Sequence, residues 1–262
     1  MRNLIIGITL ALIAIVIGIG MLTGKLKIPG MDVSDTQTPV TSTGTQISAI
    51  SEKKVDEQKG KVLYTLVTPV ITDAPILQKN IDDYVDGFKK GIVKAAEEID
   101  FEGASSNYSL NISYEVIRND EKIIVIRMSA SEYTGGAHGN PSFAFFMYDV
   151  GAKRMIGEEE VFVNKKDPTL LNLVANALIK KPQYSFEDGG VTKSMFFDVD
   201  QNRPTFIANL STGGNIALSK NGVLFKYGAY AIGPYVLGEP EIEMPLTQIE
   251  AFLTSYAKTF FK

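Results

Sequence analysis

The sequence predicts an α+β protein: antiparallel sheets with packed helices, arranged as two coupled modules and preceded by one N-terminal transmembrane helix. Three observations predict it. A long apolar run opens the chain, each later half offers an amphipathic helix beside strand-like segments, and no regular βαβ alternation is present. We therefore expect a membrane anchor over residues 1–30, a flexible linker over 31–60, and α+β modules over 61–160 and 161–262.

The apolar run from Leu4 to Leu22 contains 19 residues, of which Thr9 alone carries a polar side chain. A helix of this length spans roughly 29 Å, close to the ~30 Å hydrocarbon core of a bilayer. A secretory signal has a shorter apolar region and a small-x-small cleavage site, and no Ala-x-Ala follows here. An uncleaved single-pass anchor is the favoured interpretation and a cleaved signal the alternative. The basic residues Arg2, Lys25 and Lys27 flank both ends, so charge alone does not set the orientation.

The linker is predicted from its composition. Residues 31–60 are rich in Ser, Thr, Gln, Asp and Lys and lack apolar periodicity, so they bury too little apolar surface to offset chain entropy.

The first module is expected to combine one long helix with strands on both sides. Pro75 is suited to the first turn of a helix that ends near Ile99, and Asn119-Asp120 marks a turn between two strands. The expected strands are residues 61–70, 110–116, 123–131 and 142–149.

The second module is expected to begin with a helix that Asp167 caps and Pro168 opens. Asn221-Gly222 predicts a hairpin turn with positive φ at both residues. Thr247 and Glu250 form a capping-box pattern for a last helix. The strand-like segments between these helices are residues 195–197, 205–210, 215–218 and 223–227.

Composition excludes several classes of function. The chain has no cysteine, which removes disulfides, thiolate metal sites and a cysteine nucleophile. The residues after 30 carry a net charge of −7, so no electrostatic footprint for nucleic acid is present. With a single histidine and no Gly-x-Ser-x-Gly elbow, we expect no catalytic residue, metal site or cofactor.

A glycine-rich loop around the single histidine, His138, is the strongest candidate site. Its glycines permit tight or left-handed backbone and close approach of a partner. His138 either contacts a ligand or locks the loop by bonding a carbonyl group. Similarly, Tyr227, Tyr230 and Tyr235 either form a platform for sugar rings or belong to the core. The candidate ligand-binding residues are Tyr133, Gly135, Gly136, His138, Gly139, Asn140, Tyr230 and Tyr235.

Three stretches, taken in order, resemble a known family. They are residues 133–149, which hold the Gly-Gly-Ala-His-Gly loop, residues 223–235, which hold Tyr-x-Ile-Gly-Pro-Tyr, and residues 241–246 before the last helix. The chain from 61 to 262 resembles the family that pairs domains of unknown function 4163 and 3298. The extracytoplasmic part of lysozyme-sensing anti-sigma-V factors and the region preceding the catalytic domain of a peptidoglycan deacetylase belong there.

The resemblance implies an α+β module exposed to the cell envelope, with its body outside the cytoplasm. An anti-sigma factor needs a cytoplasmic domain before its transmembrane span, whereas three residues precede the predicted span of this chain. A deacetylase domain needs several metal-binding histidines, whereas this chain contains one histidine. We therefore expect a binding or sensing module at the cell membrane that is not an enzyme, with a protein or a cell-wall glycan as ligand. The alternatives are a structural envelope protein and a hydrolase that uses the Gly-Gly-Ala-His-Gly loop.

Overall fold

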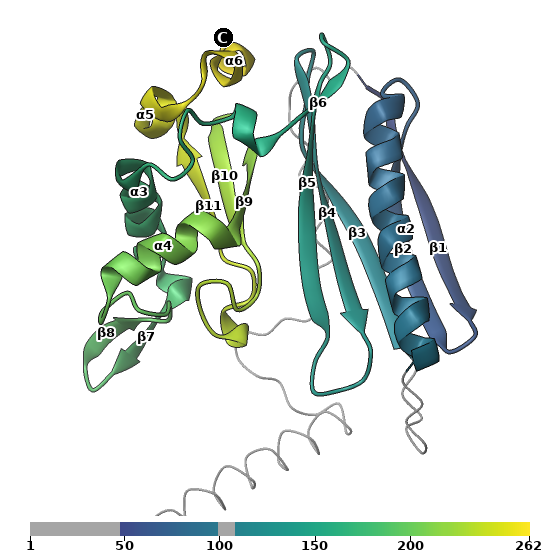
Figure 1. Ribbon diagram of the computed structural model, residues 1–262, viewed down its shortest axis with the longest axis horizontal. Helices are drawn as coiled ribbons and strands as arrows, with labels where there is room; N and C mark the ends of the chain where they lie inside the picture. The colour runs from purple at the N-terminus through teal and green to yellow at the C-terminus, as the bar shows by residue number, and fades with distance from the viewer. Residues whose placement is uncertain (1–47, 99–107) are drawn as a thin grey trace, which may run out of the picture. The chain divides into compact units, whose positions relative to one another are not determined.

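The computed structural model describes residues 48–98 and 108–262, which form an α+β body with mainly antiparallel sheets and several helices (Figure 1). This confirms the predicted fold class. The predicted anchor at Leu4–Leu22 and most of the predicted linker lie outside the described residues. Across the part of the chain that is described, none of the helices has both the length and the apolar character needed to cross a bilayer.

The first half of the body is built on one sheet, whose described strands follow the chain in the order β1-β2-β3-β4-β5-β6. The strands are β1 (Ile50–Lys59), β2 (Val62–Ile71), β3 (Tyr108–Asn119), β4 (Ile123–Tyr133), β5 (Asn140–Asp149) and β6 (Arg154–Ile156). Their pairs are antiparallel except β2 with β3, which are parallel. The sheet is therefore mixed: the predicted antiparallel pairing holds for the other described pairs but not between β2 and β3.

The parallel pair follows from helix α2 (Pro75–Glu98), which carries the chain from one end of β2 back to the start of β3. Its buried residues recur at helical spacing on one side: Leu77, Ile81, Val85, Ile92 and Ala96. This side packs on the sheet face formed by residues such as Leu110, Ile126 and Met128 (Figure 1).

Strand β1 corrects the predicted linker, because Ile50–Lys59 pairs with β2 along its whole length. Its sequence, ISEKKVDEQK, is almost entirely exposed, and its partly buried apolar residues are Ile50 and Val55. An edge strand with charged side chains gains its stability from backbone pairing rather than from apolar burial. That explains why composition alone suggested a tether.

The second half is built on a smaller antiparallel sheet in the order β11-β10-β9. Helix α3 (Pro168–Ile179) lies against β11 and packs on α4 (Arg203–Gly213) (Figure 1). The strands are β7 (Ser185–Asp188), β8 (Val191–Ser194), β9 (Gly214–Leu218), β10 (Gly222–Tyr227) and β11 (Glu241–Pro245), with β7 and β8 forming a separate hairpin. The longer helices are α3 (Pro168–Ile179) and α4 (Arg203–Gly213). Short helical turns complete it: η1 (Glu158–Glu160), η2 (Pro182–Tyr184), η3 (Tyr235–Leu237), α5 (Leu246–Ile249), η4 (Glu250–Phe252), α6 (Ser255–Lys258) and η5 (Thr259–Phe261).

Two of the predicted strands are absent from this half of the described chain. Residues 205–210 lie inside α4, where Phe206 and Leu210 are buried one helical turn apart and Pro204 sits in the first turn. Residues 195–197 form no strand. Strands over 215–218 and 223–227 are confirmed as β9 and β10.

The turn between β9 and β10 is where it was predicted, but its geometry differs. Neither Asn221 nor Gly222 has positive φ. Gly222 instead begins β10, and a Cβ on it would collide with the carbonyl oxygen of Met244 in β11. Glycine is required here by close approach of two backbones rather than by left-handed conformation.

The predicted last helix is broken in two. The chain is extended at Leu253, which forms an isolated bridge with Phe162. Thr254 then caps α6 by accepting from the backbone N–H of Ala257 at 3.0 Å, whereas Thr247 lies inside α5 and caps nothing. The helix is interrupted because the backbone here bonds to residues 161–163 instead of continuing the helical pattern. The N–H of Val163 donates to Phe252 O, and the N–H of Thr254 donates to Val161 O.

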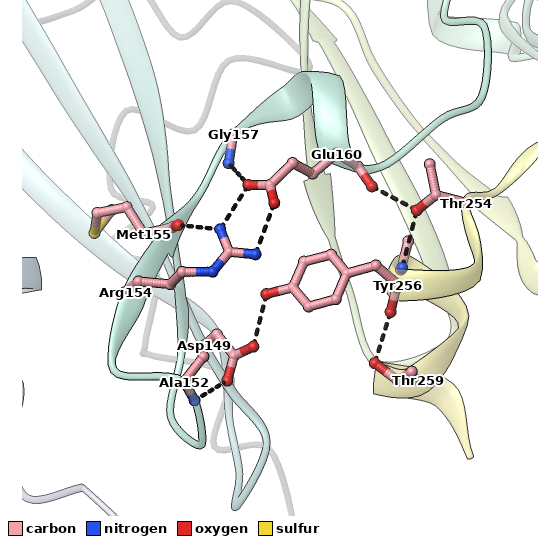
Figure 2. A network of polar contacts seen from close by, with 10 residues as sticks. Asp149, Ala152, Arg154, Met155, Gly157, Glu160, Thr254, Tyr256 and Thr259 are labelled. Atoms are coloured by element: carbon pink, nitrogen blue, oxygen red, sulfur yellow. Dashed lines mark hydrogen bonds and ion pairs between the residues drawn. The ribbon is translucent and has the colours of Figure 1, made fainter.

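A polar clasp joins this C-terminal region to the β5–β6 turn (Figure 2). Tyr256 donates from its hydroxyl to Asp149 at 2.6 Å, and Arg154 lies with its guanidinium carbon 4.9 Å from the centre of the Tyr256 ring. Arg154 also donates twice to Glu160, at 2.9 and 2.7 Å. The last residues of the chain are thus fixed to the first sheet.

Candidate functional site

The predicted glycine loop connects β4 to β5 at one end of the first sheet (Figure 1). Gly135 and Gly136 have φ of 92° and 120°, values that residues with a Cβ rarely adopt. The hydroxyl of Tyr133 donates to Gly136 O at 3.1 Å, an exposed bond across the turn. Asn140 is exposed and opens β5 opposite Glu132.

The loop meets the segment between β10 and β11 through three aromatic rings. His138 and Tyr235 are stacked, with ring centres 4.0 Å apart and planes 21° apart. Tyr230 completes the group, with its ring centre 5.5 Å from that of Tyr235 and its hydroxyl 3.5 Å from Nε2 of His138. We call His138, Tyr230 and Tyr235 the aromatic cluster.

Backbone contacts hold this cluster together. The hydroxyl of Tyr235 donates to Gly139 O at 3.0 Å, and Nδ1 of His138 lies 2.9 Å from the same oxygen. Gly139 itself is tightly placed, because a Cβ on it would lie 3.2 Å from Oγ of Ser131. The loop-locking interpretation of His138 therefore fits the geometry, and its stacking on Tyr235 adds a second role.

The three tyrosines considered together in the sequence have different environments. Tyr227 is fully buried and belongs to the core of the second half. Tyr230 is 55% exposed and has φ of 65°, in the left-handed region. A tyrosine in this conformation costs roughly 1–2 kcal/mol, and such strain is concentrated at functional sites. The candidate platform thus consists of Tyr230 and Tyr235 with His138.

A row of charged side chains lies beside the cluster and joins the two halves. Lys226 is buried in β10, with its Nζ 3.3 Å from Glu239 and 3.5 Å from Glu241. Glu241 also accepts from Arg127 of β4, which in turn donates to Glu115 of β3. Because the groups alternate in sign and are largely shielded from water, they fix the loop of β10–β11 against the first sheet.

A pocket of about 320 Å³ opens next to the glycine loop, and the surface that it exposes is mainly apolar. Its floor is the sheet face opposite α2, and its wall is Glu239. The residues that line it are Thr65, Val67, Asn111, Ile112, Ser113, Ser129, Ala130, Ser131, Pro141, Ser142 and Glu239. Sequence reasoning missed this pocket. Alternating polar residues in β3 and β4 indicate a solvent-facing side, and nothing local reveals that a loop a hundred residues away covers it.

The chemistry available here is stacking and hydrogen bonding. Among the described residues, no group of three or more His, Asp or Glu side chains is placed to hold a metal ion. Burial raises the pKa of the Glu132 carboxyl, which lies at the base of the glycine loop.

Comparisons with known proteins agree with this architecture. Residues 45–141 match the family model described as Deacetylase PdaC, and residues 159–247 match the model described as Protein of unknown function (DUF3298). No curated protein is significantly similar to the chain.

Two solved structures share the fold. A DUF3298 family protein from Pseudomonas aeruginosa PAO1 is 19% identical, with a TM-score of 0.51 over 81% of this chain and 95% of the other. A member of the same family from Bacteroides fragilis NCTC 9343 is 20% identical, with a TM-score of 0.52 over 80% of this chain and 95% of the other. The resemblance drawn from the sequence motifs is thereby confirmed: residues 159–247 match the DUF3298 model and are preceded by a region that matches the PdaC deacetylase model.

Proposed function

We propose that this protein is a binding or sensing module of the cell envelope. In this proposal Leu4–Leu22 anchors the chain in the membrane as a single span, and the body faces away from the cytoplasm. The apolar length of that run and the two family matches support this location. The module acts by binding rather than by catalysis.

The aromatic cluster is the proposed ligand-contacting surface. The observation that carries it is Tyr230, whose half-exposed ring is held by a left-handed backbone against His138 and Tyr235. Rigid aromatic faces at a surface supply contact area at low cost in side-chain entropy. They suit the apolar faces of sugar rings and the apolar side chains of a protein. A cell-wall glycan or an envelope protein is therefore the proposed ligand.

Binding can be tested with the full-length chain in detergent micelles and with soluble peptidoglycan fragments as probe. Tyr230→Ala is expected to weaken binding on the order of tenfold, which corresponds to ~1.4 kcal/mol. Phe186→Ala is the matched control, because Phe186 is 48% exposed but lies on the β7–β8 hairpin, away from the cluster. Equal affinity of the Tyr230 variant and the wild type, for fragments and for any captured envelope protein, would count against the cluster.

Location is tested separately in intact cells. Protease added outside is expected to degrade the body while the membrane fraction retains the N-terminal segment. A product found in the cytosolic fraction and protected from the protease would contradict the membrane-anchored arrangement.

A further inference from the structure

The pocket beside the aromatic cluster has the construction of a small-molecule site. Successive polar side chains on the face opposite α2 line its floor, with Thr65 from β2, Asn111 and Ser113 from β3, and Ser129 and Ser131 from β4. Its volume of about 320 Å³ lies at the lower end of the range for ligand pockets and suits one or two sugar-sized rings rather than a folded peptide.

Glu239 supplies the observation that points to a ligand. It lines the pocket, and its Oε1 atom is buried without a hydrogen-bond partner among the described residues. The other oxygen, Oε2, lies 3.3 Å from Nζ of Lys226. A buried carboxylate oxygen without a donor costs free energy, so a water molecule or a ligand hydroxyl or amide group is expected to donate to it.

The surrounding charges restrict the ligand. Three carboxylates (Glu115, Glu239 and Glu241) face two cations (Lys226 and Arg127) in the adjoining row, leaving a small negative excess. An anionic ligand is disfavoured by this excess. The surface of the pocket is mainly apolar and includes Val67 and Pro141, so it suits the C–H faces of a neutral ring. The hydroxyl and amide groups of the floor suit hydroxyl groups on the edge of such a ring.

The pocket is also continuous with the glycine loop. Ser131 and Pro141 line it and flank the two ends of that loop, and Gly139 lies against Ser131. Gly139 O in turn accepts from Tyr235 of the aromatic cluster. A glycan with one sugar ring stacked on the aromatic cluster would therefore extend toward the pocket.

We propose that this pocket binds one neutral, hydroxylated sugar ring of a glycan, with Glu239 accepting a hydrogen bond from a hydroxyl or amide group of that ring. The inference rests on the proposed binding function and deepens it by naming the ligand class and a second contact point.

The test titrates the full-length chain in detergent with N-acetylglucosamine and its short β-linked oligomers, followed by calorimetry and ligand-observed NMR. Glu239→Gln is expected to weaken binding on the order of tenfold or more. Glu241→Gln is the matched control, because it also removes an ion pair with Lys226 but does not line the pocket, and it is expected to change affinity less than about twofold. N-acetylmuramic acid, which carries a carboxylate, is expected to bind more weakly than N-acetylglucosamine.

Ser129→Ala gives a second variant that removes one floor hydroxyl without changing charge, and circular dichroism verifies that each variant is folded. Unchanged affinity in both Glu239→Gln and Ser129→Ala would overturn the inference, as would a wild-type chain that binds none of these sugars. If oligomer binding depends on Tyr230 but not on Glu239, the pocket is wrong and the proposed function stands. If it depends on Glu239 but not on Tyr230, the pocket stands and the aromatic cluster is wrong.

Discussion

Tyr227 and Tyr184 are buried tyrosines of the second half that differ in what their hydroxyl groups contact. Within the described part of the chain, the hydroxyl of Tyr227 is buried without a hydrogen-bond partner, and burial raises the pKa of its phenol far above the usual value. The hydroxyl of Tyr184 accepts from the backbone N–H of Glu241 at 3.0 Å. The ring of Tyr227 also explains why residue 214 is a glycine, because a Cβ at that position would collide with the ring.

Replacing each tyrosine with phenylalanine is expected to have opposite effects on the free energy of unfolding. Tyr227→Phe removes a buried hydroxyl group that gave up its hydrogen bonds to water on folding. We therefore expect the free energy of unfolding to remain equal or to rise by about 0.5–1 kcal/mol. Tyr184→Phe leaves the partly buried N–H of Glu241 without this acceptor and is expected to cost about 1 kcal/mol. Urea denaturation measures both. A loss above about 1 kcal/mol in Tyr227→Phe would show that its hydroxyl has a partner.

At the same scale, sequence reasoning located the site only in part. It identified the glycine loop and the Tyr230–Tyr235 segment, because unusual residue types cluster there, and the structure brings the two together at His138. The platform hypothesis grouped Tyr227 with Tyr230 and Tyr235, because burial of Tyr227 depends on the second sheet. Glu239 was not singled out either, because the pocket that it lines is built by β2, β3, β4 and β5, which lie far from it in the sequence.

At the scale of elements, the sequence predicted helices correctly where a capping residue or a proline in the first turn coincides with helical periodicity of apolar residues. Helix α2 begins at Pro75 as predicted, and α3 begins after Asp167, whose carboxylate accepts from Thr169 and Leu170. Prediction was wrong where tertiary pairing outweighs local preference. Strand β1 depends on β2 for its backbone bonds, and the break at Leu253 depends on the bridge to Phe162. Such long-range pairs leave no periodic pattern in the sequence.

The polar clasp that holds the C-terminal helices predicts a dependence on pH (Figure 2). Hydrogen bonds from Arg154 and from the backbone N–H of Gly157 lower the pKa of the Glu160 carboxyl below its usual value of 4.5. A lowered carboxyl pKa in the folded state stabilises the protein above about pH 4.5, and this contribution is lost as the pH falls through the folded-state pKa.

We therefore expect Glu160→Gln to be less stable than the wild type near neutral pH, with the difference shrinking as the pH falls below 4.5. The measurement is the urea midpoint of both proteins across that range. Glu187→Gln, at an exposed position on β7, serves as the control and should leave the pH dependence unchanged. A difference between wild type and Glu160→Gln that is constant with pH would contradict the assigned role of the carboxylate.

At the scale of the whole body, the two sheets share one apolar core. Ile123, Val125 and Met147 of the first sheet belong to the same cluster as Leu218 and Val223 of the second. A β-bulge between Val116 and Arg118 shifts the register of β3, so that Arg118 lies opposite Val125 on the face that meets the second half. The bulge thereby directs a buried guanidinium across the junction.

Arg118 bonds to both sides of that junction. It is 7% exposed, donates to Ser219 O at 3.1 Å and to Phe260 O at 2.6 Å, and pairs with Asp120 at 2.5 Å. Arg118→Met would leave the two carbonyl oxygens and Oδ2 of Asp120 without the donor that Arg118 supplies, so we expect a loss of roughly 3 kcal/mol in the free energy of unfolding.

The shared core further predicts that described residues from both sheets unfold in one cooperative transition in the wild type. Circular dichroism and tyrosine fluorescence, which the absence of tryptophan leaves unobscured, are expected to give coincident urea curves. Arg203→Met is the matched control, because Arg203 lies on α4 in an exposed bond to Asn176, and it should cost less than about 1 kcal/mol. Two separate transitions in the wild type, or equal effects of the two arginine substitutions, would show that the halves are stable independently and that Arg118 does not couple them.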